Sequence, residues 1–496
     1  MDKEINKQFS YFIIVSGFVA WVVWVLSNQF SSMLDGDAMF FLPQIVSYAN
    51  GHGLRNVYYL HTISYSPFHD GRYIWHGFLF QVIFGRILPV STYTKLASVC
   101  SILNVFSILL LALSVRKHIA ALPTKLGALV LFLILLTAGG FLIGLQGRPE
   151  TLSTLLFSCG LYAVSIKNQN IQSIILGILL GFALVTSPVP AVLVGLIVLT
   201  FWIVQFEISL RLIYNCLIAL IGFALAVTIA FIFYPYKLNE LISGIIQHRN
   251  TLHSINFTEN WRSWFIYTGH FFIMGILITA FVTGSVFIRL CFSKMILKVL
   301  AVCGVIGILI CILYFSSVSG WYVVGSMVPV LIMIIIVFLK QNHISNRKNN
   351  FALTIVLLIF AISSLDIILI SCARLTGYSG LSLNEARLSL SRDIPSRSGI
   401  AFSKSLFILT ENTNNNQVMA YEEYDMGNLL KTELPYAVIQ QSHEGRDSPP
   451  IYLNYDLYIN RFTHSKIAKG RLGQWFQPAG FGYAVYRKHI IIGNKK

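Results

Sequence analysis

The chain has 496 residues, of which 55% are hydrophobic and only 11% are charged, and its mean hydropathy is +0.69. These values lie outside the range of soluble proteins and predict a membrane-embedded chain. The formal net charge is +16, yet no basic stripe with interleaved aromatic residues is present. This argues against a nucleic-acid partner and favours contact with anionic lipid headgroups.

Apolar runs that are long enough to cross a bilayer recur as far as residue 372. We expect about eleven spans, at residues 11–30, 96–115, 126–145, 151–166, 171–187, 189–206, 211–233, 263–288, 295–314, 321–339 and 351–372. The fifth and sixth runs share Ser187-Pro188-Val189-Pro190, so they could instead form one broken or re-entrant element. The first run is too long for the core of a signal peptide and is expected to remain as an anchor.

The distribution of basic residues predicts the orientation. If the N-terminus is cytoplasmic, most basic residues next to the spans fall on the cytoplasmic side. They are Lys3, Lys7, Arg116, Lys117, Lys125, Lys167, Arg211, Arg289, Lys294, Lys298, Lys340, Arg347 and Lys348. This arrangement obeys the positive-inside rule. An odd number of spans then places the C-terminal residues outside the cytoplasm, and a bacterial inner membrane is the expected location.

A long first outer loop, residues 31–95, begins with the acids Asp35 and Asp37. The whole chain holds only 20 Asp and Glu, and a carboxylate beside hydrocarbon must be solvated, paired or protonated. Either acid could serve as a general base or bind a metal. Alternatively, both could solvate a helix end around a Gly36 turn. The loop continues with a predicted interfacial helix, Phe40–Ala49, a Gly51-His52-Gly53 turn, and an apolar helix at Tyr73–Ile87.

Polar residues in this loop predict a substrate cleft formed by His69, Asp70 and His76, with Glu150 from a later turn. The loop histidines have irregular spacing that matches no zinc template. We therefore expect no metal and no cofactor, with a divalent metal as the alternative. The seven cysteines all lie in or beside apolar runs, which argues against a disulfide framework.

Cations at the outer boundary are candidates for binding a phosphate. Arg148 precedes Pro149 and Glu150, which together form a typical helix start. Its guanidinium suits a phosphate, although it could also pair with Glu150 or reach the interface. A second outer loop, residues 234–262, adds His248, Arg249 and Arg262. The positive-inside rule disfavours cations there, so this cluster predicts an anionic site more strongly than any one member does.

Residues 373–496 are richer in charge than residues 1–372, and their apolar runs are short. We expect a small extracytoplasmic α/β domain. Its strands are predicted at Gln417–Tyr421, Tyr436–Gln440, Ile451–Leu453 and Tyr483–Tyr486, and its helices at Ser403–Thr413 and Tyr424–Leu430.

Several of these motifs together resemble the GT-C superfamily of integral-membrane glycosyltransferases that use polyprenyl-phosphate sugars, of the mannosyltransferase or aminoarabinosyltransferase type. The resemblance covers about residues 1–340. It rests on Asp35-Gly36-Asp37, the Phe40–Ala49 segment with its glycine turn, Tyr73–Leu79, Arg148-Pro149-Glu150, Thr186-Ser187-Pro188, the 234–262 loop, and Trp321-Tyr322 with Pro329. Many relatives carry Lys or Arg where this chain has Ser187.

The resemblance implies a GT-C fold and transfer of a sugar from a polyprenyl-phosphate donor to a lipid, glycan or protein acceptor. It implies that Asp35 or Asp37 is the catalytic base, in an inverting displacement. Arg148, His248, Arg249 and Arg262 are then expected to hold the donor phosphate. The main alternative is a transporter or flippase of a lipid-linked or polar solute. A non-catalytic scaffold would leave the two scarce acids unexplained.

Overall fold

The structure is a computed structural model of the whole chain. It describes residues 38–55, 72, 77–87, 93–119, 148–164, 166–187, 210–252, 381, 383–403, 416–420, 434–440, 455–461 and 482–488, with residues 8, 15, 19 and 195. The spans predicted at 126–145, 263–288, 295–314, 321–339 and 351–372, and nearly all of those at 11–30 and 189–206, lie outside the described residues.

The chain divides into two compact units. The first comprises residues 1–22, 74–82 and 99–365, and the second comprises residues 23–73, 83–98 and 366–496. The predicted boundary near residue 372 stays a prediction, since the second unit also contains segments from the first hundred residues.

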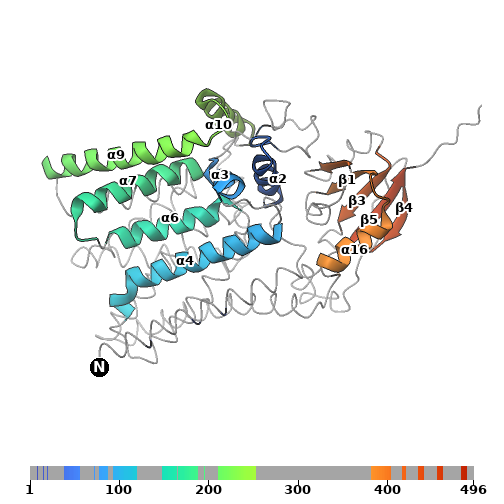
Figure 1. The fold of residues 1–496 in the computed structure, drawn as a ribbon, viewed down its shortest axis with the longest axis horizontal. Coiled ribbons are helices and arrows are strands. Elements are labelled where there is room, and N and C mark those ends of the chain that lie inside the picture. The colour runs from blue at the N-terminus through green and yellow to red at the C-terminus, as the bar shows by residue number, and fades with distance from the viewer. Residues whose placement is uncertain are drawn as a thin grey trace, which may run out of the picture. The chain divides into compact units, whose positions relative to one another are not determined.

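Helices make up the described part of the first unit. They are α3 (Leu79–Val82), α4 (Tyr93–Ile119, in this unit from residue 99), α6 (Pro149–Ala163), α7 (Gln169–Thr186), α9 (Leu210–Ile232) and α10 (Leu238–Leu252). Figure 1 shows α6, α7 and α9 lying side by side along one direction. Helices α4, α6, α7 and α9 correspond to four of the predicted spans, with ends that differ by a few residues.

Helices α6 and α7 form an antiparallel hairpin. Asn168 caps the start of α7, because its side-chain oxygen accepts from the backbone N–H groups of Asn170 and Ile171 at 3.1 and 3.2 Å. Inside the same turn, the Gln172 amide donates to the carbonyl oxygens of Ala163 and Val164 at 3.1 and 2.9 Å. Gln172 therefore satisfies carbonyls that the end of α6 would otherwise leave unpaired.

Helices α7 and α9 run parallel, and residues 42 positions apart face each other at every fourth position. Ser173 donates to the Asn215 side-chain oxygen at 3.0 Å, 42 residues away, and one turn earlier Arg211 donates to the side chain of Gln169. One turn later a Cβ added to Gly177 would lie 2.0 Å from the Ala219 carbonyl oxygen. The backbones thus approach too closely for any side chain at position 177, as in small-residue contacts between membrane helices.

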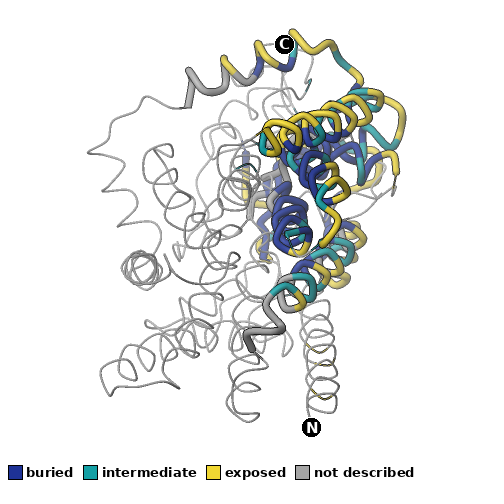
Figure 2. The backbone as a smooth tube through the Cα atoms, turned by 90° about the vertical axis from the view of Figure 1, so that its left-hand side faces the viewer, coloured by how far each residue is buried: buried dark blue, intermediate teal, exposed yellow. Residues whose placement is uncertain are grey.

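Two described helices, α7 and α9, are long and apolar enough to cross a membrane, judged by length and composition. Along α9, large apolar side chains are exposed from one end to the other: Leu210, Ile213, Tyr214, Leu217, Leu220, Ile221, Leu225, Ile229 and Ile232. Its small residues Ala219, Gly222, Ala226 and Ala230 are buried. Helix α9 therefore buries its small residues and exposes its large apolar ones, and Figure 2 shows buried and exposed residues alternating around the described helices.

The described start of the second unit is helix α2 (Ala38–Ala49), which confirms the helix predicted in the first loop. It ends in the predicted turn, where Gly51 and Gly53 adopt φ values of 81° and 76° that favour glycine. A π-helix, η1 (Ile83–Ile87), packs on α2 so closely that a Cβ on Gly85 would lie 2.9 Å from the Ile45 carbonyl oxygen. In the described part of the apolar helix predicted at Tyr73–Ile87, the chain is helical from Leu79 onward, as α3 and then η1, and residues 73–76 lie outside the described residues.

The C-terminal part of the second unit contains a five-stranded mixed sheet, in the order β2-β1-β3-β5-β4. The strands are β1 (Gly399–Ser403), β2 (Asn416–Ala420), β3 (Tyr436–Gln440), β4 (Tyr455–Asn460) and β5 (Tyr483–Lys488). Strand β1 pairs in parallel with β2 and β3, whereas β5 runs antiparallel to β3 and β4.

The sheet confirms three of the predicted strands, β2, β3 and β5, within two residues at each end. Strands β1 and β4 were not predicted, and Ser403, the predicted start of a helix, is the last residue of β1. The strand predicted at Ile451–Leu453, the helix at Tyr424–Leu430 and the rest of the helix at Ser403–Thr413 lie outside the described residues.

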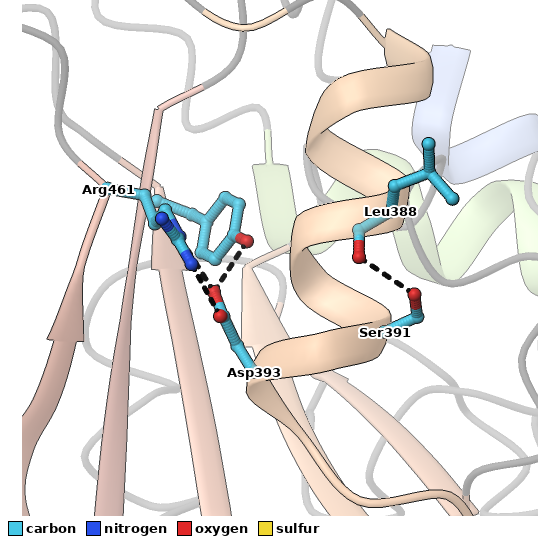
Figure 3. A network of polar contacts seen from close by, with 5 residues as sticks. Leu388, Ser391, Asp393 and Arg461 are labelled. Atoms are coloured by element: carbon cyan, nitrogen blue, oxygen red, sulfur yellow. Dashed lines mark hydrogen bonds and ion pairs between the residues drawn. The ribbon is translucent and has the colours of Figure 1, made fainter.

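Helix α16 (Leu383–Asp393) is tied to the sheet by its last residue. Arg461 donates to both carboxylate oxygens of Asp393, at 2.9 and 2.7 Å, and the Tyr483 hydroxyl donates to the same carboxylate at 2.9 Å (Figure 3). We call these three residues the Asp393 clamp. Burial, followed by the hydrogen bond to Asp393, raises the pKa of Tyr483 above its ordinary value.

Candidate functional site

One end of the helical unit collects the described residues that bear on function. The α6–α7 hairpin places the start of α6 at the end of α7, and the parallel pairing of α7 with α9 places the end of α9 there too. Helix α3 packs on both α6 and α7. We call this the shared end: Arg148, Gly77 to Val82, Thr186, and Phe231 to Tyr236.

Arg148 directly precedes α6 and adopts an extended backbone, with φ −110° and ψ 153°. Pro149 follows as the first helical residue, as the sequence predicts. The side chain of Arg148 is only 1% exposed, which makes it the largest of the fully buried side chains among the described residues. A buried guanidinium must be paired, and Arg148 does interact within the protein. Any phosphate that it binds must therefore reach the interior of the unit.

The segment before α3 is fixed to the end of α7 by a backbone contact. A Cβ added to Gly77 would lie 2.3 Å from the Thr186 carbonyl oxygen and 2.4 Å from that of Val185. No side chain fits at position 77 without moving one of these backbones. The contact therefore sets the position of the chain that follows His76, one of the predicted cleft residues.

An aromatic cluster lies beside this contact. The ring of Phe78 stacks on Tyr234 with centroids 4.2 Å apart, and it meets Phe231 edge to face at 5.1 Å. Tyr236 packs edge to face on Tyr234 at 5.6 Å. These contacts hold the turn after α9 against the start of α3. They also bury Tyr234, and burial followed by its neighbours Tyr236 and Glu240 raises the pKa of its hydroxyl.

Two buried polar groups at the shared end have no hydrogen-bond partner in the part of the chain that the structure describes: the Tyr234 hydroxyl and the whole side-chain amide of Gln81. Gln81 is completely buried in α3. Sequence reasoning did not single it out, although a lone glutamine inside an apolar run is the signal that could have done so. Such groups are rare in folded proteins because each carries a desolvation cost.

The predicted catalytic acids lie outside the described residues. Asp37 directly precedes α2 in the sequence, and Asp35 comes two residues earlier. His69, Asp70, His76 and Arg262 also lie outside the described residues. Glu150 is the second residue of α6, and His248 and Arg249 belong to α10, but only their helical backbones are described. The predicted site as a whole therefore stays a prediction. Within the described ranges, no three His, Cys, Asp or Glu gather in a way that could hold a metal ion.

Comparison with known proteins gives a result only at the level of structure. No family model and no curated protein matches the chain. Among solved structures it is similar to ArnT from Cupriavidus metallidurans in the apo state, with a TM-score of 0.57, 13% identity and coverage of 96% of this chain and 97% of that one. The chain shares the fold of ArnT.

Two further structures match at TM-scores below 0.5. One is the oligosaccharyltransferase of Archaeoglobus fulgidus tethered to an acceptor peptide, with a TM-score of 0.47, 12% identity and coverage of 88% of this chain and 69% of that one. The other is AglB from the same organism with an inhibitory peptide and a dolichol-phosphate, with a TM-score of 0.41, 13% identity and coverage of 87% and 69%. The likeness to ArnT alone establishes the shared fold, which agrees with the GT-C fold that the sequence motifs implied.

Proposed function

We propose that the protein transfers a sugar from a polyprenyl-phosphate-linked donor to an acceptor hydroxyl at the outer face of a membrane. The observation that carries this proposal is the GT-C fold over 96% of the chain, joined to the two acids that precede α2. A fold alone does not specify chemistry. The acids supply what the reaction needs, because a carboxylate can accept the acceptor's proton.

In the proposed reaction, Asp35 or Asp37 takes the proton from the acceptor hydroxyl while its oxygen bonds to the anomeric carbon. The bond from that carbon to the phosphate oxygen breaks, and polyprenyl phosphate leaves with the electron pair. This direct displacement inverts the anomeric carbon. The phosphate is a stable anion, so neither a general acid nor a cofactor is required.

Cations near the departing phosphate would stabilise the charge that develops on it. We propose Arg148, His248, Arg249 and Arg262 for this role. The burial of Arg148 supports a contact inside a closed, weakly solvated site, where a charge interaction is stronger than in water. His69, Asp70, His76 and Glu150 are proposed to line the cleft that holds the sugar and the acceptor.

The proposed location is an integral membrane position, in a bacterial inner membrane with a cytoplasmic N-terminus and an extracytoplasmic C-terminal α/β domain. Support comes from the outward face of α9, where side chains such as Leu217 and Ile221 are exposed over the whole length of the helix. Contiguous apolar surface of this extent is unusual on a soluble protein. About eleven spans are proposed in total.

The proposal is tested by the release of polyprenyl phosphate from a panel of polyprenyl-phosphate sugars, each offered to the purified protein in lipid with a mixed acceptor extract. We expect release from one donor, and loss of most of that release in Asp35→Asn or Asp37→Asn, whichever is the base. Removal of a general base typically costs about 10²–10⁴-fold in rate.

Glu207→Gln is the matched control, since Glu207 lies between the apolar runs 189–206 and 211–233, close to Arg211 and therefore on the side expected to be cytoplasmic. Full activity in both Asp35→Asn and Asp37→Asn would eliminate the proposed base. Uptake of a lipid-linked donor into vesicles without any phosphate release would instead favour a flippase.

A further inference from the structure

Helix α10 carries an apolar stripe that the rest of the protein leaves uncovered. Leu238, Ile242 and Ile246 are 55%, 50% and 54% exposed. They are spaced four residues apart, so they line one face of the helix over its first three turns. Three exposed aliphatic side chains in a row are unfavourable in water, because each leaves apolar area unburied.

The other faces of α10 have a different character. Leu241 and Gly244 are buried and turn toward the protein. Asn239 and Ser243 are exposed, and each follows a stripe residue by one position, which puts a polar strip along one border of the apolar stripe. The helix therefore has three sides: one packs on the protein, one is polar and exposed, and one is apolar and exposed.

The apolar stripe follows closely in sequence on the outward face of α9. That face ends with Ile229 and Ile232, 40% and 71% exposed, only a short turn before Leu238. At this turn the chain leaves the direction of α9, so that α10 runs at an angle to it (Figure 1). Exposed aliphatic residues thus stand on both sides of the turn, at the end of α9 and along α10, and the turn between them holds Lys237.

We propose that α10 lies in the outer membrane–water interface, with Leu238, Ile242 and Ile246 inserted among the lipid acyl chains. This rests on the membrane location given under the proposed function. A bilayer fits the observations because it covers α9 and α10 with the same apolar medium, whereas a protein partner would have to follow the chain around the turn. Amphipathic helices at such interfaces bury their apolar face by roughly 5–10 Å.

The proposal also assigns a position to the cations of α10. His248 and Arg249 belong to the last turns of the helix, so an interfacial α10 holds them at the depth of the phosphate groups of the bilayer. A lipid-linked donor presents its own phosphate at this depth. The helix would then set the height at which the proposed site meets its donor.

The test places a genetically encoded fluorescent amino acid at Ile242 or at Ser243 in the full chain, reconstituted in phosphatidylcholine–phosphatidylglycerol vesicles. We expect bromine-labelled lipid to quench the fluorophore at 242 and aqueous iodide to quench the one at 243. Position 243 is the matched control because it is one residue away on the same helix.

A third position, Ile221 on α9, separates the failure of this inference from the failure of the membrane assignment. If lipid quenches position 221 while iodide quenches 242, α10 is not interfacial but the membrane location stands. If iodide quenches all three positions, both proposals fall. If neither agent quenches position 242, another protein surface covers the stripe, which also overturns the inference.

Discussion

Two contacts between distant segments show different ways of holding this molecule together. Helix α7 meets α9 where side chains are missing, with Gly177 directly on the Ala219 backbone. Helix α16 meets the sheet through charge, with Asp393 bound by Arg461 and Tyr483. The first contact depends on shape and tolerates no added atom. The second depends on partial burial of an ion pair, so it responds to proton binding and can be weakened one hydrogen bond at a time.

The largest expected effect comes from Gly177→Ala. Its Cβ would lie 2.0 Å from a backbone oxygen, so α7 and α9 must separate. Overpacking of this kind costs about 3 kcal/mol at the upper end of its usual range. Hydrogen exchange measured by mass spectrometry should show faster exchange in α7 and α9, with the sheet unchanged.

Gly195→Ala is the matched control for this variant, because its Cβ would lie 3.5 Å from Leu180 Cδ1, an ordinary contact. If Gly177→Ala were as stable as Gly195→Ala, the close approach of the two helices would be wrong.

A smaller effect is expected from Asp393→Asn, which removes the charge that Arg461 pairs with. The Arg461 side chain is 40% exposed, so water can solvate it once the pair is lost. We expect a loss of about 2 kcal/mol, which is within the range for hydrogen bonds to charged groups. Hydrogen exchange should become faster in α16 and β5 while α7 is unaffected.

Asp456→Asn is the control for this variant. Asp456 is exposed on β4, and its substitution is expected to cost less than about 1 kcal/mol of stability. An equal loss of stability in both variants would contradict the Asp393 clamp.

The smallest effect at neutral pH is expected from Tyr483→Phe, about 1 kcal/mol for one hydrogen bond. The pKa of Tyr483 is raised in the folded protein, so the unfolded chain loses this proton first as the pH rises. The stabilisation is complete below pH of about 10 and is lost progressively above it, by at most about 1.4 kcal/mol per pH unit. Unfolding by denaturant between pH 8 and 11 should show this slope in the parent and a weaker one in Tyr483→Phe. Tyr458→Phe, on edge strand β4, serves as the control, and an unchanged slope in Tyr483→Phe would refute the prediction.

The sequence predicted which segments are helices better than it predicted how they meet. The runs at 171–187 and 211–233 became α7 and α9 almost unchanged, because length and apolar composition suffice to define a spanning helix. The pairing of α7 with α9 at an offset of 42 residues could not be predicted. A helix face that contacts lipid and one that contacts another helix are both apolar, so they have the same sequence pattern. Only the four-residue spacing of Ser173, Gly177 and Gly181 hints at it.

In the sheet, there is also a physical reason why strand β4 was not predicted. Strand β3 reads as an apolar run and was predicted at its correct bounds, whereas β4 is a mostly exposed strand of six residues at the edge of the sheet. Its partner β5 follows only after residues 461–482, so no short turn marks the pairing in the sequence. For the site, the helix start at Pro149 was predicted from local rules. The burial of Arg148 and Gln81 depends on tertiary packing, which no local rule describes.

The fixed offset between α7 and α9 also has a consequence for synthesis. Ser173 leaves the ribosome 42 residues before its partner Asn215. At the usual rate of translation this interval is roughly 2–8 s. Throughout that time the polar and glycine face of α7 has no α9 to pack against. A pause in translation before residue 215 would lengthen the time for which this face of α7 stays without its partner.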